Sequence, residues 1–269
     1  MKRNLIIFVA FLAVIPSCYA DDFTKTLEKA ERGNAKAQNE LAEKYLCGDG
    51  VALDYEQAAV WYAKSAKQGN AVAQLKLALM YESGCGLSQD YVQAVALYRK
   101  SANQGYAEAQ CCLGNMYYYG YGVSQDYSEA LVWYAKSAEQ GYEEAQLKLG
   151  LMFERGYAEG PNYTKAMFWY RKAAKQNNAQ AQKFIGDMYY KGYGVEKDYA
   201  KAVTWYRKAA GQDYVTAQYN LGYMYECGYG VVQDYSQAMM WYRSAANHGH
   251  LKAKQRYEKL VSQGFSPAK

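Results

Sequence analysis

The residues that could perform catalysis or bind a metal are few and scattered in this chain of 269 residues. The two histidines, His248 and His250, stand close together, but two ligands do not complete a metal site. One Ser-x-x-Lys sequence, at residues 266–269, lacks the Ser-Asp-Asn and Lys-Thr-Gly partners that enzymes acting on β-lactams carry. The His-Glu-x-x-His, Gly-x-Ser-x-Gly and Cys-x-x-Cys sequences are absent. The sequence therefore predicts a protein that is not an enzyme, with no catalytic residue, metal or cofactor.

The cysteines offer one possible bridge. Cys47 and Cys227 hold equivalent positions of an internal repeat, too far apart along the chain to meet. Cys47 and Cys85 fall in neighbouring loops, where they could form a disulfide in an oxidising compartment or remain thiols. Cys111 and Cys112 have no histidine nearby, so we interpret them as small helix residues and not as metal ligands.

A Gly-x-Gly sequence could in principle cradle a phosphate, and it occurs repeatedly. The pairs are Gly48/Gly50, Gly84/Gly86, Gly120/Gly122, Gly192/Gly194 and Gly228/Gly230. Each follows a helical pattern and lacks the third glycine of a dinucleotide-binding loop. We therefore expect these glycines to end a helix and reverse the chain, because glycine adopts positive φ at little cost. Residues 156–161 depart from the pattern and should follow another path.

The elements that carry these residues recur every 36 residues along the chain. Trp61, Trp133, Trp169, Trp205 and Trp241 share one position, and Leu97 fills the remaining one. A tyrosine follows each time, at Tyr62, Tyr98, Tyr134, Tyr170, Tyr206 and Tyr242. A fixed period of this length is typical of solenoids, in which each unit packs on its neighbours.

Each unit reads as two amphipathic helices, as in residues 71–81 and 91–104. The second helix has a cap in every unit, at Asp54, Asp90, Asp126, Asn162, Asp198 and Asp234. Three residues later, Gln57, Gln93, Glu129 and Gln237 predict capping boxes. Gly114, Gly150, Gly186 and Gly222 lie inside the first helix, where glycine costs about 1 kcal/mol relative to alanine. We infer that neighbouring helices approach closely there.

Residues 1–20 are predicted to be a signal peptide. Lys2 and Arg3 precede an apolar run that is too short to span a bilayer, and the residues up to Ala20 suit cleavage. A second possibility is a lipid tether on Cys18. The remaining chain would be periplasmic or secreted, with no transmembrane segment. Its positive and negative charges are interspersed, which argues against a nucleic-acid partner.

The repeated residues resemble those of the SEL-one-like repeat family, related to the tetratricopeptide repeats. The resemblance is carried by Ala-x-Ala-Gln at 71–74, 107–110 and 179–182, and by residues 113–117, 120–123, 126–130 and 133–138. It implies an all-α, right-handed α/α superhelix of about six helix-turn-helix repeats, with partial capping helices at residues 27–33 and 251–263. Residues 21–264 would form one domain, followed by a tail at 265–269. The family also implies adaptors that assemble protein complexes, including many exported bacterial proteins.

Functional residues are expected where the repeats differ, because positions free of packing can specialise. On one face of the first helices we predict partner-binding residues: Asn115, Tyr119, Leu151, Arg155, Phe184, Asp187, Lys191 and Tyr223. The aromatic residues would anchor a peptide or protein in the concave groove, and the polar ones would set its register. The alternative for this face is a solvated surface. The function predicted is an exported, non-enzymatic interaction scaffold; the alternatives are a β-lactamase or penicillin-binding enzyme and a toxin-neutralising immunity protein.

Overall fold

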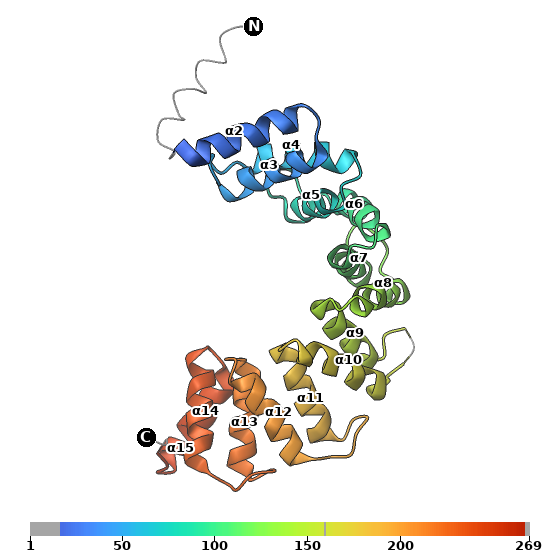
Figure 1. Cartoon of the computed structure of the whole chain (residues 1–269). Coiled ribbons are helices and arrows are strands. Elements are labelled where there is room, and N and C mark those ends of the chain that lie inside the picture. Colours follow the sequence, from blue (N-terminus) through green and yellow to red (C-terminus); the bar gives the residue numbers. More distant parts are fainter. Residues whose placement is uncertain (1–16, 159, 267–269) are drawn as a thin grey trace. The chain divides into compact units, whose positions relative to one another are not determined.

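The computed structural model describes residues 17–158 and 160–266, and within these ranges it contains fourteen α-helices and no strand (Figure 1). The helices are α2 (Ser17–Glu31), α3 (Ala35–Cys47), α4 (Tyr55–Lys67), α5 (Ala71–Ser83), α6 (Tyr91–Asn103), α7 (Ala107–Tyr119), α8 (Tyr127–Glu139), α9 (Glu143–Arg155), α10 (Tyr163–Lys175), α11 (Ala179–Lys191), α12 (Tyr199–Ala210), α13 (Val215–Cys227), α14 (Tyr235–Asn247) and α15 (Leu251–Ser262). Residues 1–16, most of the predicted signal peptide, lie outside the described residues.

Odd-numbered helices from α3 to α15 are the first helices of their repeats, and even-numbered helices from α2 to α14 are the second helices. Within a repeat, α3 packs on α4, α5 on α6, α9 on α10, α11 on α12 and α13 on α14, and these contacts are more extensive than those to the next repeat. The predicted all-α array of six helix pairs is confirmed. A second helix, α2, and a first helix, α15, flank the six pairs as predicted, but α2 begins ten residues before the predicted residues 27–33 and is a full-length helix.

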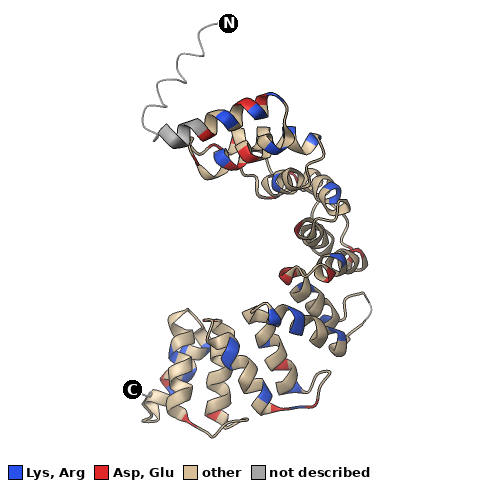
Figure 2. Cartoon of the chain, in the orientation of Figure 1, with Lys and Arg blue, Asp and Glu red and all other residues tan. Residues whose placement is uncertain are grey.

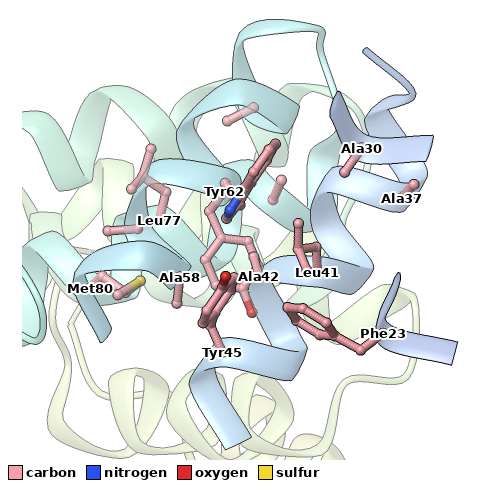
Figure 3. Packing of buried hydrophobic residues seen from close by; sticks show 14 residues of the cluster. Phe23, Ala30, Ala37, Leu41, Ala42, Tyr45, Ala58, Tyr62, Leu77 and Met80 are labelled. Atoms are coloured by element: carbon pink, nitrogen blue, oxygen red, sulfur yellow. The ribbon is translucent and has the colours of Figure 1, made fainter. Parts of the chain in front are cut away.

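The chain divides into two compact units, residues 1–133 and 134–269, with the boundary inside α8. In the N-terminal unit, buried residues of α2, α3, α4 and α5 form one core. Phe23 and Tyr45 meet edge to face, with ring centroids 5.8 Å apart. Figure 3 shows them in the same core as Leu41 and Tyr62. Alanines such as Ala42 and Ala58 belong to the same core, which combines large rings with small residues.

The glycines inside the first helices lie beneath the tyrosines of the second helices. A Cβ at Gly150 would come within 2.5 Å of the Tyr170 ring, and a Cβ at Gly186 within 2.6 Å of the Tyr206 ring. Both tyrosines are buried. The inferred close approach of neighbouring helices is therefore confirmed, and the specific cause is a tyrosine ring.

The predicted caps of the second helices are confirmed, but the capping boxes are wrong in one respect. Oδ1 of Asp90 accepts hydrogen bonds from the backbone N–H groups of Val92 and Gln93 at 2.9 and 3.0 Å. The Asp90 backbone N–H, which the Gln93 side chain was expected to bind, donates instead to the carbonyl of Tyr81 at 2.9 Å. This bond ties the loop to the preceding first helix, so the return half of the capping box is unnecessary.

The second glycine of the Gly-x-Gly loops allows contact between repeats. Gly86 has φ of 72°, and a Cβ there would lie 2.3 Å from the carbonyl oxygen of Tyr55, the first residue of the preceding second helix. Gly230 is held in the same way against Tyr199. In the divergent fourth loop, Ala158 takes φ of 73°, a conformation that favours glycine.

A ladder of paired glutamines, one of each pair buried and the other exposed, links the repeats. The repeat pattern alone does not reveal this role. Nε2 of Gln38 donates to the carbonyl of Ala30 at 3.0 Å, and Oε1 of Gln38 accepts from Gln68 at 2.7 Å. The same amide pairs recur between Gln104 and Gln74, Gln176 and Gln146, and Gln212 and Gln182. One glutamine of each pair is the fourth residue of a first helix, directly after an alanine, and the other lies at the end of a second helix.

The cysteines, possible metal ligands and chain ends complete the description. Cys47 and Cys85 are both thiols, so they form no disulfide in this structure. No group of three potential ligands in the described part of the chain could hold a metal. Helices in the same part are too short or too polar to cross a bilayer. Phe265, assigned to the tail, packs on Tyr235 with ring centroids 4.2 Å apart.

Candidate partner-binding site on the first helices

The predicted binding residues of the N-terminal unit lie on α7. Tyr119 is 48% exposed, and its ring stacks on Tyr121 with centroids 5.4 Å apart and meets Tyr118 edge to face at 4.8 Å. Tyr121 in turn stacks on Tyr91 at 5.0 Å. Asn115, one turn earlier than Tyr119, is half-buried. These residues form an aromatic surface but line neither of the two pockets described below.

Six predicted residues belong to the C-terminal unit, and the structure brings three of them together. Asp187 and Lys191 of α11 and Tyr223 of α13 line a pocket of about 410 Å³, here called the α11–α15 pocket. Its full lining is Lys183, Asp187, Tyr190, Lys191, Tyr206, Thr216, Tyr219, Asn220, Tyr223, Met224 and Arg256. Leu151 and Arg155 on α9 lie elsewhere. Phe184 also lies outside the lining, because its ring stacks on Tyr170 at 5.0 Å.

Lys183, Tyr190, Tyr219 and Arg256 are pocket residues that sequence reasoning missed. A signal existed for two of them, since the position shared by Lys183 and Tyr219 holds the buried Leu75 and Leu147 in other repeats. The exchange of a buried leucine for a lysine or tyrosine at this position distinguishes these two repeats from the others. Arg256 was overlooked because α15 was interpreted only as a cap.

Asp187 is not free to specialise, contrary to the expectation from its variable repeat position. Its carboxylate accepts a hydrogen bond of 2.8 Å from the hydroxyl of Tyr206 and pairs with Nζ of Lys183 at 2.6 Å. Nδ2 of Asn220 donates to the same carboxylate at 3.3 Å. The Asp187 side chain is 15% exposed. It therefore organises the pocket from within, while still forming part of the lining.

The reason lies in the repeat pattern. In other repeats, the acceptor for the buried tyrosine hydroxyl is a glutamate nearer the end of the first helix: Glu82 for Tyr98, Glu154 for Tyr170 and Glu226 for Tyr242. In α11 that position is Tyr190, which has no carboxylate to accept the hydrogen bond from Tyr206. Asp187, one turn earlier, takes its place. The substitution moves a carboxylate into the pocket and leaves a tyrosine at its rim.

Arg256 lies on the α15 side of the pocket. Nη1 of Arg256 pairs with the carboxylate of Glu226 at 2.7 Å, and the guanidinium carbon lies 4.9 Å from the centroid of the Tyr223 ring. Burial is the largest single influence and disfavours the charged guanidinium, but the hydrogen bond to Glu226 and the negative charges of neighbouring groups together raise the pKa of Arg256. The cation is therefore permanent, and it fixes the orientation of the Tyr223 ring.

Tyrosines supply the rest of the lining. Tyr219 stacks on His250 with centroids 4.6 Å apart, and Nδ1 of His250 accepts a hydrogen bond of 3.1 Å from the Ala253 backbone as the cap of α15. This contact gives His250 a structural role. Burial and the neighbouring Asp187 charge raise the pKa of Tyr206. A hydrogen-bonding contact with Cys227, together with burial, raises the pKa of Tyr223. Both phenols are therefore neutral hydrogen-bonding groups at neutral pH.

A second pocket, of about 390 Å³, lies in the N-terminal unit, between α2 and α3, and its lining is mainly acidic. It is lined by Asp22, Thr26, Asn39, Glu40, Glu43, Lys44, Cys47 and Asp49. Nζ of Lys44 pairs with Asp22 at 2.6 Å and with Asp49 at 3.3 Å, which leaves Glu40 and Glu43 to give the pocket its negative character. Figure 2 shows acidic and basic segments side by side on α2 and α3.

Together, these features define a helical-repeat protein that presents pockets on its first helices. Six consecutive stretches match the Sel1 repeat: residues 35–70, 71–106, 107–142, 143–178, 179–214 and 215–250. The chain belongs to the Sel1 repeat family. Proteins of this family are generally protein-interaction scaffolds, and they are typically non-enzymatic.

Two solved structures are particularly similar. One is a protective antigen present in uropathogenic Escherichia coli strains that displays an SLR fold; it is 38% identical, with a TM-score of 0.88 over 92% of this chain. This chain spans 53% of the length of that protein. The other is a Sel1 repeat protein from Oxalobacter formigenes, 34% identical, with a TM-score of 0.76, covering 84% of this chain and 91% of that one. No curated protein matches the chain significantly.

Proposed function

We propose that this protein is an exported interaction scaffold that binds a protein or peptide partner in the α11–α15 pocket. The observation that carries the proposal is the concentration of Tyr190, Tyr219 and Tyr223 around a pocket of about 410 Å³, beside Lys191 and Arg256. Tyrosine and arginine are the residue types that most often dominate binding energy at protein interfaces. The ring of Tyr219 is already held by His250 and that of Tyr223 by Arg256, so these two side chains lose little freedom on binding.

Export is supported by the sequence of residues 1–20, with basic residues before a short apolar run and small residues near Ala20. The similar Escherichia coli protein is described as a protective antigen, which fits a protein that reaches the cell surface or its surroundings. Fractionation of cells into cytoplasm, periplasm, membrane and medium tests this part. Recovery of the full-length chain in the cytoplasm alone would contradict it.

The binding proposal is tested by affinity capture from the envelope fraction, followed by titration of the purified partner. Tyr223→Ala is expected to weaken binding by roughly tenfold or more, as for residues at the centre of an interface. Phe168→Ala is the matched control, because Phe168 is an exposed aromatic residue on α10, outside the pocket lining. A partner that binds both variants as tightly as the wild type would contradict the assignment of the pocket.

A further inference from the structure

The charges around the α11–α15 pocket point to the chemistry of the partner. Three cationic side chains line it, Lys183, Lys191 and Arg256, against the single carboxylate of Asp187. Glu226 pairs with Arg256 but is not part of the lining. The pocket surface is therefore net positive, although it is built largely from tyrosine and small polar residues.

Two of the three cations retain hydrogen-bond donors after their internal pairing. Lys183 has three N–H donors and uses its ammonium to pair with Asp187 at 2.6 Å. Arg256 has five donors and pairs with Glu226 through Nη1 at 2.7 Å. These ion pairs hold both side chains in place, so their remaining donors are positioned before any ligand arrives.

Lys191 differs from the other two. It is exposed at the last residue of α11, and no carboxylate among the described residues pairs with it. Its Nζ lies 5.2 Å from the centroid of the exposed Tyr193 ring. An ammonium held beside an aromatic ring and lacking a counter-charge attracts an anionic group from a partner.

The first repeat provides an internal comparison. Glu40 and Glu43 occupy there the repeat positions of Arg256 and of Asp187 and Tyr223, and they line a pocket with Asp22 and Asp49. The same face of the fold is thus negative in the N-terminal unit and positive around the α11–α15 pocket. Because the repeat itself imposes neither sign, the positive charge belongs to the particular residues of α11 and α15 and not to a requirement of the fold.

We infer that the α11–α15 pocket binds an acidic polypeptide segment, with an Asp or Glu side chain placed against Lys191, Lys183 and Arg256 beside an aromatic or apolar residue on the tyrosine lining. The inference rests on the proposed function and names the class of partner. A basic segment is repelled by Lys191, the one of the three cations that no carboxylate among the described residues offsets, and finds no free acceptor on Lys183 or Arg256. A neutral segment leaves the spare donors of Lys183 and Arg256 without a charged acceptor, and thus lacks the charge-assisted hydrogen bonds that an acidic segment gains.

The test is a selection of random peptides displayed on phage against the immobilised full chain, followed by titration of the enriched peptides as synthetic, end-capped molecules. End-capping removes the terminal carboxylate, so any acidic group that binds is a side chain. The expected result is enrichment of Asp or Glu next to an aromatic or apolar residue. Affinity should fall roughly tenfold or more with Lys191→Glu and should weaken as salt increases.

Lys208→Glu is the matched control, since Lys208 is an exposed lysine over the Trp205 ring on α12 and does not line the pocket. Peptides that are lost on Tyr223→Ala but carry neutral or basic sequences would overturn the inference and leave the proposed function intact. Peptides unaffected by Tyr223→Ala, or no enrichment, would overturn both. Equal loss in Lys191→Glu and Lys208→Glu would show a diffuse charge effect and overturn the inference.

Discussion

The hydroxyl of Tyr206 donates a hydrogen bond of 2.8 Å to the carboxylate of Asp187, one helical turn before the position from which a glutamate accepts the equivalent bond in other repeats. This relationship joins the core of a repeat to the lining of its pocket. The same carboxylate also orients Lys183. Removing the acid therefore affects both the stability of the C-terminal unit and the order of its binding surface.

The first prediction concerns this pair. Asp187→Ala should destabilise the protein by about 1–3 kcal/mol, because it leaves the Tyr206 hydroxyl buried without its acceptor. The double variant Asp187→Ala with Tyr206→Phe should lose less stability than the sum of the two single variants. A double-mutant cycle measured by urea unfolding should give a coupling energy of about 0.5–3 kcal/mol. Asp187→Ala combined with Tyr98→Phe, in the other unit, should be additive. Additivity of the Asp187 and Tyr206 variants would contradict the contact.

The second prediction concerns the glycine beneath that tyrosine. Gly186→Ala should destabilise the protein by about 1–3 kcal/mol through overpacking, because the new Cβ meets the Tyr206 ring at 2.6 Å. Helix propensity alone would predict a gain of about 0.8–1.0 kcal/mol. Ala78, a buried alanine at the same repeat position, is the control: Ala78→Gly should lose only about 1 kcal/mol. Thermal unfolding distinguishes the two, and a more stable Gly186→Ala variant would refute the packing argument.

The third prediction separates backbone strain from steric contact in the glycine loops. Gly249 has φ of 83°, and a Cβ added there would meet only open space, so Gly249→Ala should cost about 1–2 kcal/mol from the left-handed conformation alone. Gly230 has φ of 68°, and a Cβ there would lie 2.3 Å from the carbonyl carbon of Tyr199. Gly230→Ala should therefore lower the melting temperature clearly more than Gly249→Ala. Equal losses would show that contact between repeats does not restrict Gly230.

The fourth prediction is a pH dependence in the N-terminal unit. The hydrogen bond from Lys44 lowers the pKa of Asp22 below its usual 3.8, and the same bond raises the pKa of Lys44 above 10.5. For Asp22, the stabilisation is complete above pH 3.8 and is lost as the pH falls through the lowered pKa of the folded state. For Lys44, the stabilisation is complete below pH 10.5 and is lost as the pH rises through the raised pKa of the folded state.

Melting temperatures of the wild type and Asp22→Asn, measured across pH, check this window. The wild type should be the more stable protein at neutral pH, and the difference should shrink in strongly acidic and in strongly alkaline solution. Glu28→Gln is the control, because the exposed pair of Glu28 and Arg32, at 3.8 Å, should contribute less. A difference that is constant with pH would show that the change acts through packing and not through charge.

Much of the fold was predictable because the residues that pack between helices recur at the same positions in successive repeats. The tyrosines after each tryptophan, the aspartate caps and the glycines inside the first helices recur together, and each has a local physical meaning. The glutamine of Ala-x-Ala-Gln was visible too, but its meaning was not: its partners, such as Ala30 and Gln68 for Gln38, lie in two different helices. The return bond of the capping box failed for a similar reason, since the competing carbonyl belongs to the preceding helix.

The site was only partly predictable. Choosing positions where the repeats differ selected Lys191 and Tyr223, which line the α11–α15 pocket. The same rule selected Asp187 as a residue free of packing, and this premise is wrong, because Tyr190 replaces the usual glutamate in α11 and Asp187, one turn earlier, accepts the bond from Tyr206. Such compensation within one helix requires knowing which side chains face the next helix. Lys183 and Arg256 come from helices that are far apart in sequence, and only their packing brings them to one pocket.

The glutamine ladder limits how such a chain can change length. Gln218 bonds to the carbonyl of Ala210 at 3.4 Å, but its buried Oε1 has no hydrogen-bond partner in the described part of the chain, where the next donor position holds the exposed His248. A glutamine at position 248, as at the equivalent position of the preceding repeats, would supply the amide donor that Gln218 lacks. We therefore expect duplications and deletions to be tolerated as whole blocks of 36 residues, the length of the matched repeats, since any other length would bring the wrong side chain to each buried amide.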